Sequence, residues 1–166
     1  MELLVVRHGI ALDREMALEQ AMADKDRPLT AKGRSRMKRI AKGLRRTVPN
    51  LLSIFSSPLV RAIETAEIVA SEYGDAPCAR TPALLPEADP DELVPVLADE
   101  TGDAPLAVVG HEPHLSHFVT WCLAGERSPL VELKKGGSCL LRFDGMPAQG
   151  SARLIWLAPP AILRHI

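Results

Sequence analysis

The chain has few cysteines, few aromatic residues and no long apolar run, and each shortage excludes a class of protein. Its 166 residues contain three cysteines, Cys78, Cys122 and Cys139, with no C-x-x-C spacing. This argues against a disulfide framework and against a thiolate zinc site, so we expect all three to be small core residues. No apolar run approaches the roughly 18 residues that span a bilayer, and the start of the chain is too short and wrongly flanked for a secretory signal. We therefore expect a cytoplasmic protein that does not enter a membrane.

The net charge is also small, at −1, and aromatic residues make up only 4% of the chain. Such a chain offers neither the strong field nor the stacking platforms of a nucleic-acid-binding protein. The cations are unevenly placed, because no Asp or Glu lies between Arg27 and Ile63 while half of the 20 lysines and arginines do. A block of one sign attracts an acidic partner. A solvated helix face, balanced by acids elsewhere in the fold, explains the block equally well, and both interpretations stay open.

The remaining composition, 46% hydrophobic and 25% charged, is typical of a globular protein, and the length predicts one domain over residues 1–166. Three short apolar runs are typical of buried strands: Leu3–Val6, Leu51–Phe55 and Leu106–Val109. Near the end of the chain, Ser138–Phe143 and Ala152–Leu157 are typical of a hairpin. The pattern predicts a three-layer α/β domain with a mainly parallel sheet, helices on both faces and an antiparallel edge near the C-terminus.

Four helices are expected between and after these strands. The basic stretch is helical from about Thr30 and buries Met37, Ile40, Ala41 and Leu44. Ser57 and Pro58 are suited to cap and open the second helix, and Asp89 and Pro90 to begin the third. Pro113 opens the fourth, which ends at Gly125. Residues 10–29 fit no strong period and are expected to form a loop or a short helix over the site.

Polar side chains follow each of the three strands, at the sheet edge where α/β proteins bind ligands. These are Arg7 and His8 after the first strand, Ser56 and Ser57 after the second with Arg61 one helical turn later, and His111 after the third. On neighbouring strands, two guanidiniums, two imidazoles and a helix N-terminus converge on one point, which favours a phosphoryl group. Gly9 lets the backbone approach closely. A single histidine in such a place is usually structural, but packing does not explain polar residues at three strand ends.

The motifs at these strand ends resemble those of the histidine phosphatase superfamily, which includes phosphoglycerate-mutase-like proteins. The resemblance rests on Leu4-Val5-Val6-Arg7-His8-Gly9, on Ser56-Ser57-Pro58-Leu59-Val60-Arg61-Ala62-x-x-Thr65-Ala66 and on Val108-Val109-Gly110-His111. The compact length, Arg27-Pro28-Leu29-Thr30-x-x-Gly33 and the tail Trp156-Leu157-Ala158-Pro159-Pro160 look most like the small SixA-type branch of phosphohistidine phosphatases.

This resemblance implies a phosphatase without metal or other cofactor, in which His8 is the nucleophile and phosphoryl acceptor. Arg7, Arg61 and His111 would bind the transferred oxygens, with Gly9 and Ser57 beside them. An imidazole attacks phosphorus only when it is unprotonated, so we expect a backbone carbonyl to hold its other nitrogen as a donor. The arginines then stabilise the charge on the equatorial oxygens, and water hydrolyses phospho-His8.

A general acid is not obvious. Glu87 and Asp89 are the nearest candidates by position, although Asp89 is more simply a helix N-cap. Phosphohistidine leaves through an imidazole nitrogen, which needs less protonation than an alkoxide, so an acid-poor site suits a P–N bond. We therefore predict hydrolysis of phosphohistidine on a protein partner, with a role in signalling, or of a small phosphoramidate.

Other functions remain as alternatives. A small-molecule phosphomonoesterase of the same superfamily would be expected to enclose its substrate, whereas short loops and the lack of a cap domain leave this pocket open. A non-catalytic phosphoprotein-binding module would need only arginine and lysine, so His8 disfavours it. Zinc at His111, Glu112, His114 and His117 is disfavoured because the i, i+4 spacing is missing and because His114 and His117 are expected to face away from the buried stripe. No G-x-G-x-x-G follows the first strand, which argues against a dinucleotide.

Overall fold

The computed structural model describes residues 1–100, 102–126 and 128–166, and its strands form a six-stranded sheet in the order β3-β2-β4-β1-β5-β6. The strands are β1 (Glu2–Arg7), β2 (Ile54–Ser56), β3 (Cys78–Arg80), β4 (Leu106–Gly110), β5 (Ser138–Phe143) and β6 (Ala152–Ala158). The first four are parallel, whereas β5 runs antiparallel to both β1 and β6. The predicted mainly parallel sheet with an antiparallel edge is confirmed.

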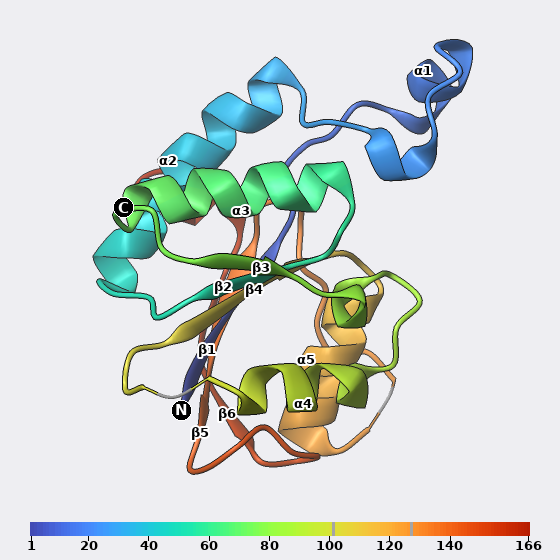
Figure 1. Cartoon of the computed structure of the whole chain (residues 1–166). Helices are drawn as coiled ribbons and strands as arrows, with labels where there is room; N and C mark the ends of the chain where they lie inside the picture. Colours follow the sequence, from blue (N-terminus) through green and yellow to red (C-terminus); the bar gives the residue numbers. More distant parts are fainter. Residues whose placement is uncertain (101, 127) are drawn as a thin grey trace.

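Helices lie on both faces of this sheet, with α2 and α3 on one side and α4 and α5 on the other (Figure 1). The α-helices are α1 (Arg14–Glu19), α2 (Ala31–Thr47), α3 (Val60–Glu72), α4 (Leu93–Ala98), α5 (His114–Ala124) and α6 (Pro160–Leu163). Three single turns of 3-10 helix are η1 (Asp24–Asp26), η2 (Pro82–Leu84) and η3 (Pro90–Glu92). Within the described residues, no helix is both long enough and apolar enough to cross a membrane.

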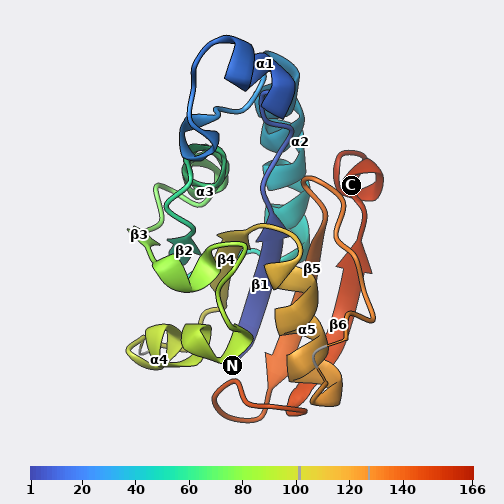
Figure 2. The same cartoon turned by 90° about the vertical axis from the view of Figure 1, so that its right-hand side faces the viewer.

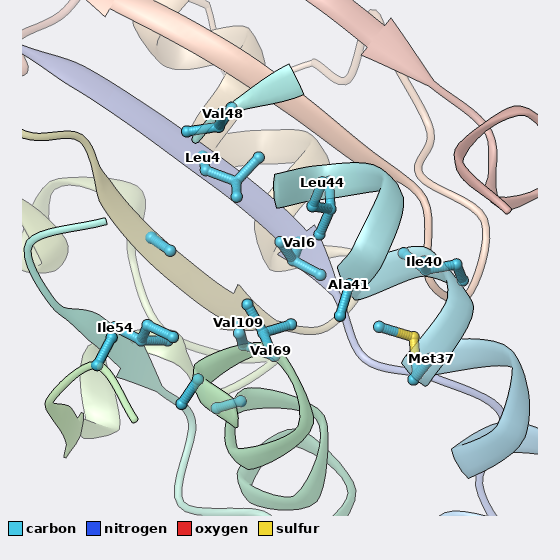
Figure 3. Close-up of a cluster of buried hydrophobic side chains, with 14 of the residues drawn as sticks. Leu4, Val6, Met37, Ile40, Ala41, Leu44, Val48, Ile54, Val69 and Val109 are labelled. Carbon is cyan, nitrogen blue, oxygen red and sulfur yellow. The ribbon is translucent and has the colours of Figure 1, made fainter. Parts of the chain in front are cut away.

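The two faces of the sheet build two apolar clusters. Side chains alternate along a strand, so Leu4 and Val6 of β1 point to one face while Leu3 and Val5 point to the other. On the first face they meet the buried stripe of α2, which is Met37, Ile40, Ala41 and Leu44 as predicted (Figure 3). Thr30 caps that helix, because its hydroxyl accepts a hydrogen bond from the Gly33 amide at 2.9 Å. The apolar period and the cap together explain where α2 begins.

Some local expectations are wrong. Ser57 does not cap α3 and Pro58 does not open it, because α3 begins at Val60 and Leu59 is at its N-cap position. The Ser57 hydroxyl accepts from the Leu59 amide at 3.4 Å and lies 2.9 Å from Nε2 of His111. Cys78 is exposed, since the edge strand β3 is uncovered along its length, whereas Cys122 and Cys139 are buried as expected. His114 is fully buried, because α5 packs against η3 on that side.

Residues 10–29 form an arm that leaves the sheet and returns. Figures 1 and 2 show it, with α1 near its tip, beyond the carboxyl end of β1. Its two ends are joined by backbone hydrogen bonds, from the Leu12 amide to the Pro28 carbonyl at 2.8 Å and from the Thr30 amide to the Ile10 carbonyl at 2.9 Å. The arm therefore has short helical turns, as expected, and a closed base next to Gly9.

Candidate active site

The order of the strands brings the predicted residues to one place. β4 lies between β1 and β2, so His111 at its end is next to His8 at the end of β1. The centroids of the two imidazole rings lie 4.8 Å apart, and the ring planes are tilted by 51°. Arg7, His8, Arg61 and His111 all line a pocket of about 520 Å³. A pocket with two guanidiniums and two imidazoles suits an anion.

His8 is held in a single orientation and in its neutral form. Its Nδ1 lies 2.7 Å from the carbonyl oxygen of Gly9, and its own amide donates to the Gly110 carbonyl at 3.1 Å. A carbonyl only accepts, so Nδ1 carries the proton and the lone pair is on Nε2. Burial, together with the charges of Arg61 and Arg7, lowers the pKa of His8 to about 3 despite the opposing Gly9 hydrogen bond. The expected carbonyl partner is therefore present, and Nε2 is an available nucleophile.

His111 is also buried and neutral. Burial, followed by the proximity of His8, lowers its pKa to about 2. Its Nε2 lies 2.9 Å from the hydroxyl oxygen of Ser57, while its Nδ1 is buried and has no hydrogen-bond partner in the described part of the chain. Ser57 itself does not line the pocket, so its position is that of a residue that orients His111.

Arg61 reaches the pocket from the first turn of α3 and is only 3% exposed. Its Nη1 donates to the backbone carbonyl of Asp24 at 2.8 Å, and its Nη2 donates to the Asp24 carboxylate at 3.2 Å. One turn later, the hydroxyl of Thr65 accepts from the Gly9 amide at 3.1 Å and donates to the Arg61 carbonyl at 2.7 Å. The Nε atoms of Arg61 and Arg7 are buried without a partner among the described residues. Buried donors without a protein partner are rare, and a bound anion would explain them.

Arg7 is fixed by residues 133–137, which we call the 133–137 loop. Its Nη1 donates to the Leu133 carbonyl, and its amide donates to the Gly137 carbonyl at 3.0 Å. The Leu133 amide in turn donates to Oε1 of Glu112 at 2.9 Å, and the Ser116 amide donates to Oε2 at 3.2 Å. Glu112 therefore lines the pocket with both carboxylate oxygens occupied by protein donors.

Four of the residues expected at the site do not line the pocket, namely Ser57, Glu87, Asp89 and Gly9. Glu87 and Asp89 are exposed and do not line it, and the Asp89 amide donates to the Glu92 carboxylate at 3.2 Å at the start of η3. Gly9 does not line it either. A Cβ on Gly9 would lie 2.6 Å from Cγ of Met37, so the glycine allows α2 to approach the strand end.

The structure adds pocket residues that sequence reasoning missed, chiefly Arg14, Arg27 and Lys135. Arg27 is 7% exposed and pairs with the Asp24 carboxylate at 3.0 Å, and Arg14 pairs with the same carboxylate at 3.3 Å. Arg27 is part of both the Arg27-Pro28-Leu29-Thr30 motif and the basic block. Its place in that motif, immediately before Pro28, is the sequence signal that could have identified it as a pocket residue. Asp13 and Glu15, at the start of α1, also line the pocket.

The zinc interpretation finds no support in the geometry. Over residues 1–100, 102–126 and 128–166, no three or more His, Cys, Asp or Glu side chains are grouped so as to hold a metal ion. Glu112 is bound to Leu133 and Ser116, and His114 is buried within α5.

Known proteins are similar to this chain in sequence and in fold. A family model described as the histidine phosphatase superfamily (branch 1) matches residues 3–89. An uncharacterised protein of Picosynechococcus is 36% identical over 163 residues, which cover 93% of this chain and 88% of that protein.

Two solved structures have the same fold over nearly the whole chain. The protein histidine phosphatase SixA, complexed with tungstate, has a TM-score of 0.80 and 25% identity, covering 98% of this chain and 99% of SixA. A mycobacterial glucosyl-3-phosphoglycerate phosphatase has a TM-score of 0.70 and 17% identity, covering 95% of this chain and 99% of that one.

Proposed function

The chain belongs to the histidine phosphatase superfamily, and from that premise we propose that it hydrolyses phosphohistidine on a protein partner through a phosphorylated His8. The observation that carries the proposal is the hydrogen bond from His8 Nδ1 to the Gly9 carbonyl, which leaves Nε2 free beside two arginines. Likeness to SixA, described as a protein histidine phosphatase, supports the choice of a P–N substrate. Tungstate in that structure is a tetrahedral oxyanion of the kind this pocket suits.

In the first step, Nε2 of His8 forms a bond to phosphorus as the P–N bond of the substrate breaks. The electron pair of that bond moves to the leaving imidazole nitrogen, which takes up a proton from water. Arg7 and Arg61 stabilise the charge on the equatorial oxygens, which preorganised cations do without reorganising during the reaction. His111 is neutral, and its buried Nδ1 provides a further donor when the Ser57 hydroxyl donates to Nε2.

In the second step, water attacks the phosphorus of phospho-His8. The Nε2–P bond breaks, its electron pair returns to Nε2, and inorganic phosphate leaves with the oxygen of the water. The Gly9 carbonyl keeps Nδ1 protonated throughout, so the regenerated imidazole has the tautomer needed for the next turnover. We propose that no metal or other cofactor takes part.

Three carboxylates line the pocket, those of Asp13, Glu15 and Glu112, and two of them are already held by backbone amides, which favours a substrate that needs no strong general acid. Asp13 accepts a hydrogen bond from the Glu15 amide at 2.9 Å, and Glu112 is bound to Leu133 and Ser116. Both are occupied in local structure. An imidazole leaving group requires less protonation than an alkoxide, so we expect faster turnover of a phosphohistidine protein than of an alkyl phosphate.

The test is to mix the protein with a phosphohistidine-bearing protein and to follow acid-labile phosphate on this chain. We expect a phosphoenzyme that disappears in His8→Ala, with a loss of turnover of at least about 10³-fold, and a loss of roughly 10²-fold in Arg61→Ala. His117→Ala, on α5 outside the pocket, is the matched histidine control. Stable binding without a phosphoenzyme would instead indicate a phosphoprotein-binding module.

A small-molecule phosphomonoesterase is the second candidate, and the arm favours it. Arg14 and Glu15 of α1 line the pocket, so part of the arm borders the place proposed for the phosphoryl group. A panel of phosphohistidine protein, phosphoramidate and sugar phosphates distinguishes the two functions. Equal or faster turnover of the sugar phosphates would favour the small-molecule enzyme.

A further inference from the structure

Lys135 lies at the mouth of the pocket, on a loop fixed to the residues that would carry out catalysis. The Gly136 amide donates to the backbone carbonyls of both Arg7 and His8 at 3.1 Å, and the Gly137 amide donates to the Lys134 carbonyl at 2.6 Å. Lys135 is exposed and lines the pocket, whereas its neighbour Lys134 is exposed and does not. The 133–137 loop therefore presents one of its two lysines to the pocket.

The ammonium of Lys135 has no partner within ion-pair distance among the described residues. By contrast, Arg14, Arg27 and Arg61 share the Asp24 carboxylate. Burial, and then the nearby charges of Arg7 and Arg27, lower the pKa of the Lys135 ammonium, although the nearby charge of Asp13 opposes this.

Lys135 also lines a second, smaller pocket, and two further cations, Arg36 and Arg164, line that pocket with it. A cation held among cations raises the free energy of the folded state, because like charges repel. Such an arrangement is typical of a binding site rather than of a residue that stabilises the fold.

The position of Lys135 limits what it can bind. Arg7, His8, Arg61 and His111 already surround the place for the transferred group, and a pocket of about 520 Å³ is much larger than a phosphoryl group. We propose that Lys135 binds a carboxylate that the substrate carries beside its phosphoryl group, and so selects substrates with an acidic neighbour. The inference rests on the proposed function for the place of the phosphoryl group.

The test compares two phosphonates that the protein does not hydrolyse. 3-Phosphonopropionate carries a carboxylate beside its phosphonate, and propylphosphonate does not. We expect calorimetry to give about three- to fivefold tighter binding of 3-phosphonopropionate to the wild type, as for a partly exposed ion pair. Lys135→Met removes this preference, Lys135→Arg retains it, and the control Lys134→Met leaves it unchanged.

A stability measurement separates binding from a structural role. Since Lys135 is repelled by its neighbours, Lys135→Met raises the thermal midpoint at low ionic strength, and the rise fades with added salt. A lower midpoint, or a preference for 3-phosphonopropionate that survives Lys135→Met, would overturn the proposal. Equal binding of both phosphonates by the wild type removes the role of Lys135 alone. If neither phosphonate binds, the anion pocket fails and the proposed function fails with it.

Discussion

The carboxylate of Asp24 lies 3.2 Å from Nη2 of Arg61 and 3.0 Å from Nη2 of Arg27, so one acid of the arm holds two guanidiniums at the pocket. Asp24 is half exposed, but Arg27 and Arg61 are buried. Burial raises the pKa of the Asp24 carboxyl, yet the charges of Arg61 and Arg27 more than offset this and hold the pKa below 3.8. The arm is therefore part of the site as well as a cover over it.

Asp24→Asn tests this positioning. Removing the charge weakens the bond that orients Arg61, so we expect kcat/KM for a phosphohistidine substrate to fall about tenfold, equivalent to roughly 1.4 kcal/mol. Because the pKa of Asp24 is depressed, its contribution is present through neutral pH and is lost only as the pH falls through that lowered value. Asp26→Asn, in the same turn, makes the same charge change and should leave kcat/KM unchanged. A tighter binding of inorganic phosphate without loss of rate would mean that Asp24 competes with the substrate.

The two pocket imidazoles predict a pH dependence of stability. The pKa values of His8 and His111 are lowered to about 3 and about 2, chiefly by burial, from an ordinary value of 6.5. The unfolded chain therefore takes up protons first, and the free energy of unfolding falls steadily as the pH drops from about 6.5 towards 3. In NMR titrations of the folded protein, neither ring should change its protonation between pH 8 and pH 5. In urea both rings should titrate normally, and a folded-state titration near pH 6 would contradict the prediction.

Loss of the Thr65 hydroxyl is expected to lower the free energy of unfolding. Its hydroxyl bridges the Gly9 amide and the Arg61 carbonyl, and the side chain is fully buried. Thr65→Val keeps the shape but leaves the Gly9 amide without a partner, so we expect the free energy of unfolding to fall by about 1–3 kcal/mol. Thr47→Val is the control, because that hydroxyl is at the exposed end of α2. The free energy of unfolding is measured with urea. Equal losses in the two variants would show that the hydrogen bonds of Thr65 stabilise the fold no more than those of an exposed threonine.

Much of the frame was predictable because its signals are local in the sequence. The apolar runs of β1 and β4 and the stripe of α2 follow the periods of buried strands and amphipathic helices. Convergence of His8, Arg61 and His111 then followed from where ligands bind in parallel sheets. The edge strand β3 was missed because its residues are exposed and have no apolar pattern.

The rest of the pocket depends on contacts between distant segments. Arg7 is bound by Leu133, 126 positions away, and Arg61 by Asp24, 37 positions away. No local period indicates such pairs, so neither the path of the arm nor the place of Lys135 could be read from the sequence. Spacing within the helix places His114 away from the apolar stripe, yet the structure buries it, because the burial of a helix face depends on its neighbours, here η3.

A side chain at Gly33, at the base of the arm, is expected to lower the free energy of unfolding. A Cβ on this residue would lie 2.0 Å from the backbone oxygen of Ile10, which directly follows Gly9. Gly33→Ala must displace the arm or α2, so we expect a loss of about 1–3 kcal/mol in the free energy of unfolding together with reduced turnover. Gly145→Ala is the control, because its Cβ would meet nothing within 4 Å, and the expected change is under about 0.5 kcal/mol.

The basic block predicts how a protein partner docks, once its internal pairs are separated from its exposed charges. Arg34 is paired with Glu64, whose other oxygen accepts from the Leu29 amide at 2.6 Å, so reversing Arg34 would disturb the arm itself. Arg36 lies beside Lys135 near the pocket, and Arg39 is exposed further along α2. Arg36→Glu and Arg39→Glu should therefore slow turnover of an acidic phosphoprotein several-fold at low salt, because encounter is steered by charge.

Those two variants should leave turnover of a small phosphoramidate nearly unchanged, since it needs only the pocket. Between them, Arg36→Glu should have the larger effect, because Arg36 is nearer to the pocket mouth and the field of a charge falls within about 10 Å at 0.1 M salt. Lys42→Glu, at the far end of α2, tests the same distance dependence. An unchanged rate on the phosphoprotein in all three variants would mean that the basic face of α2 is only a solvated surface, and that the partner is recognised at the pocket alone.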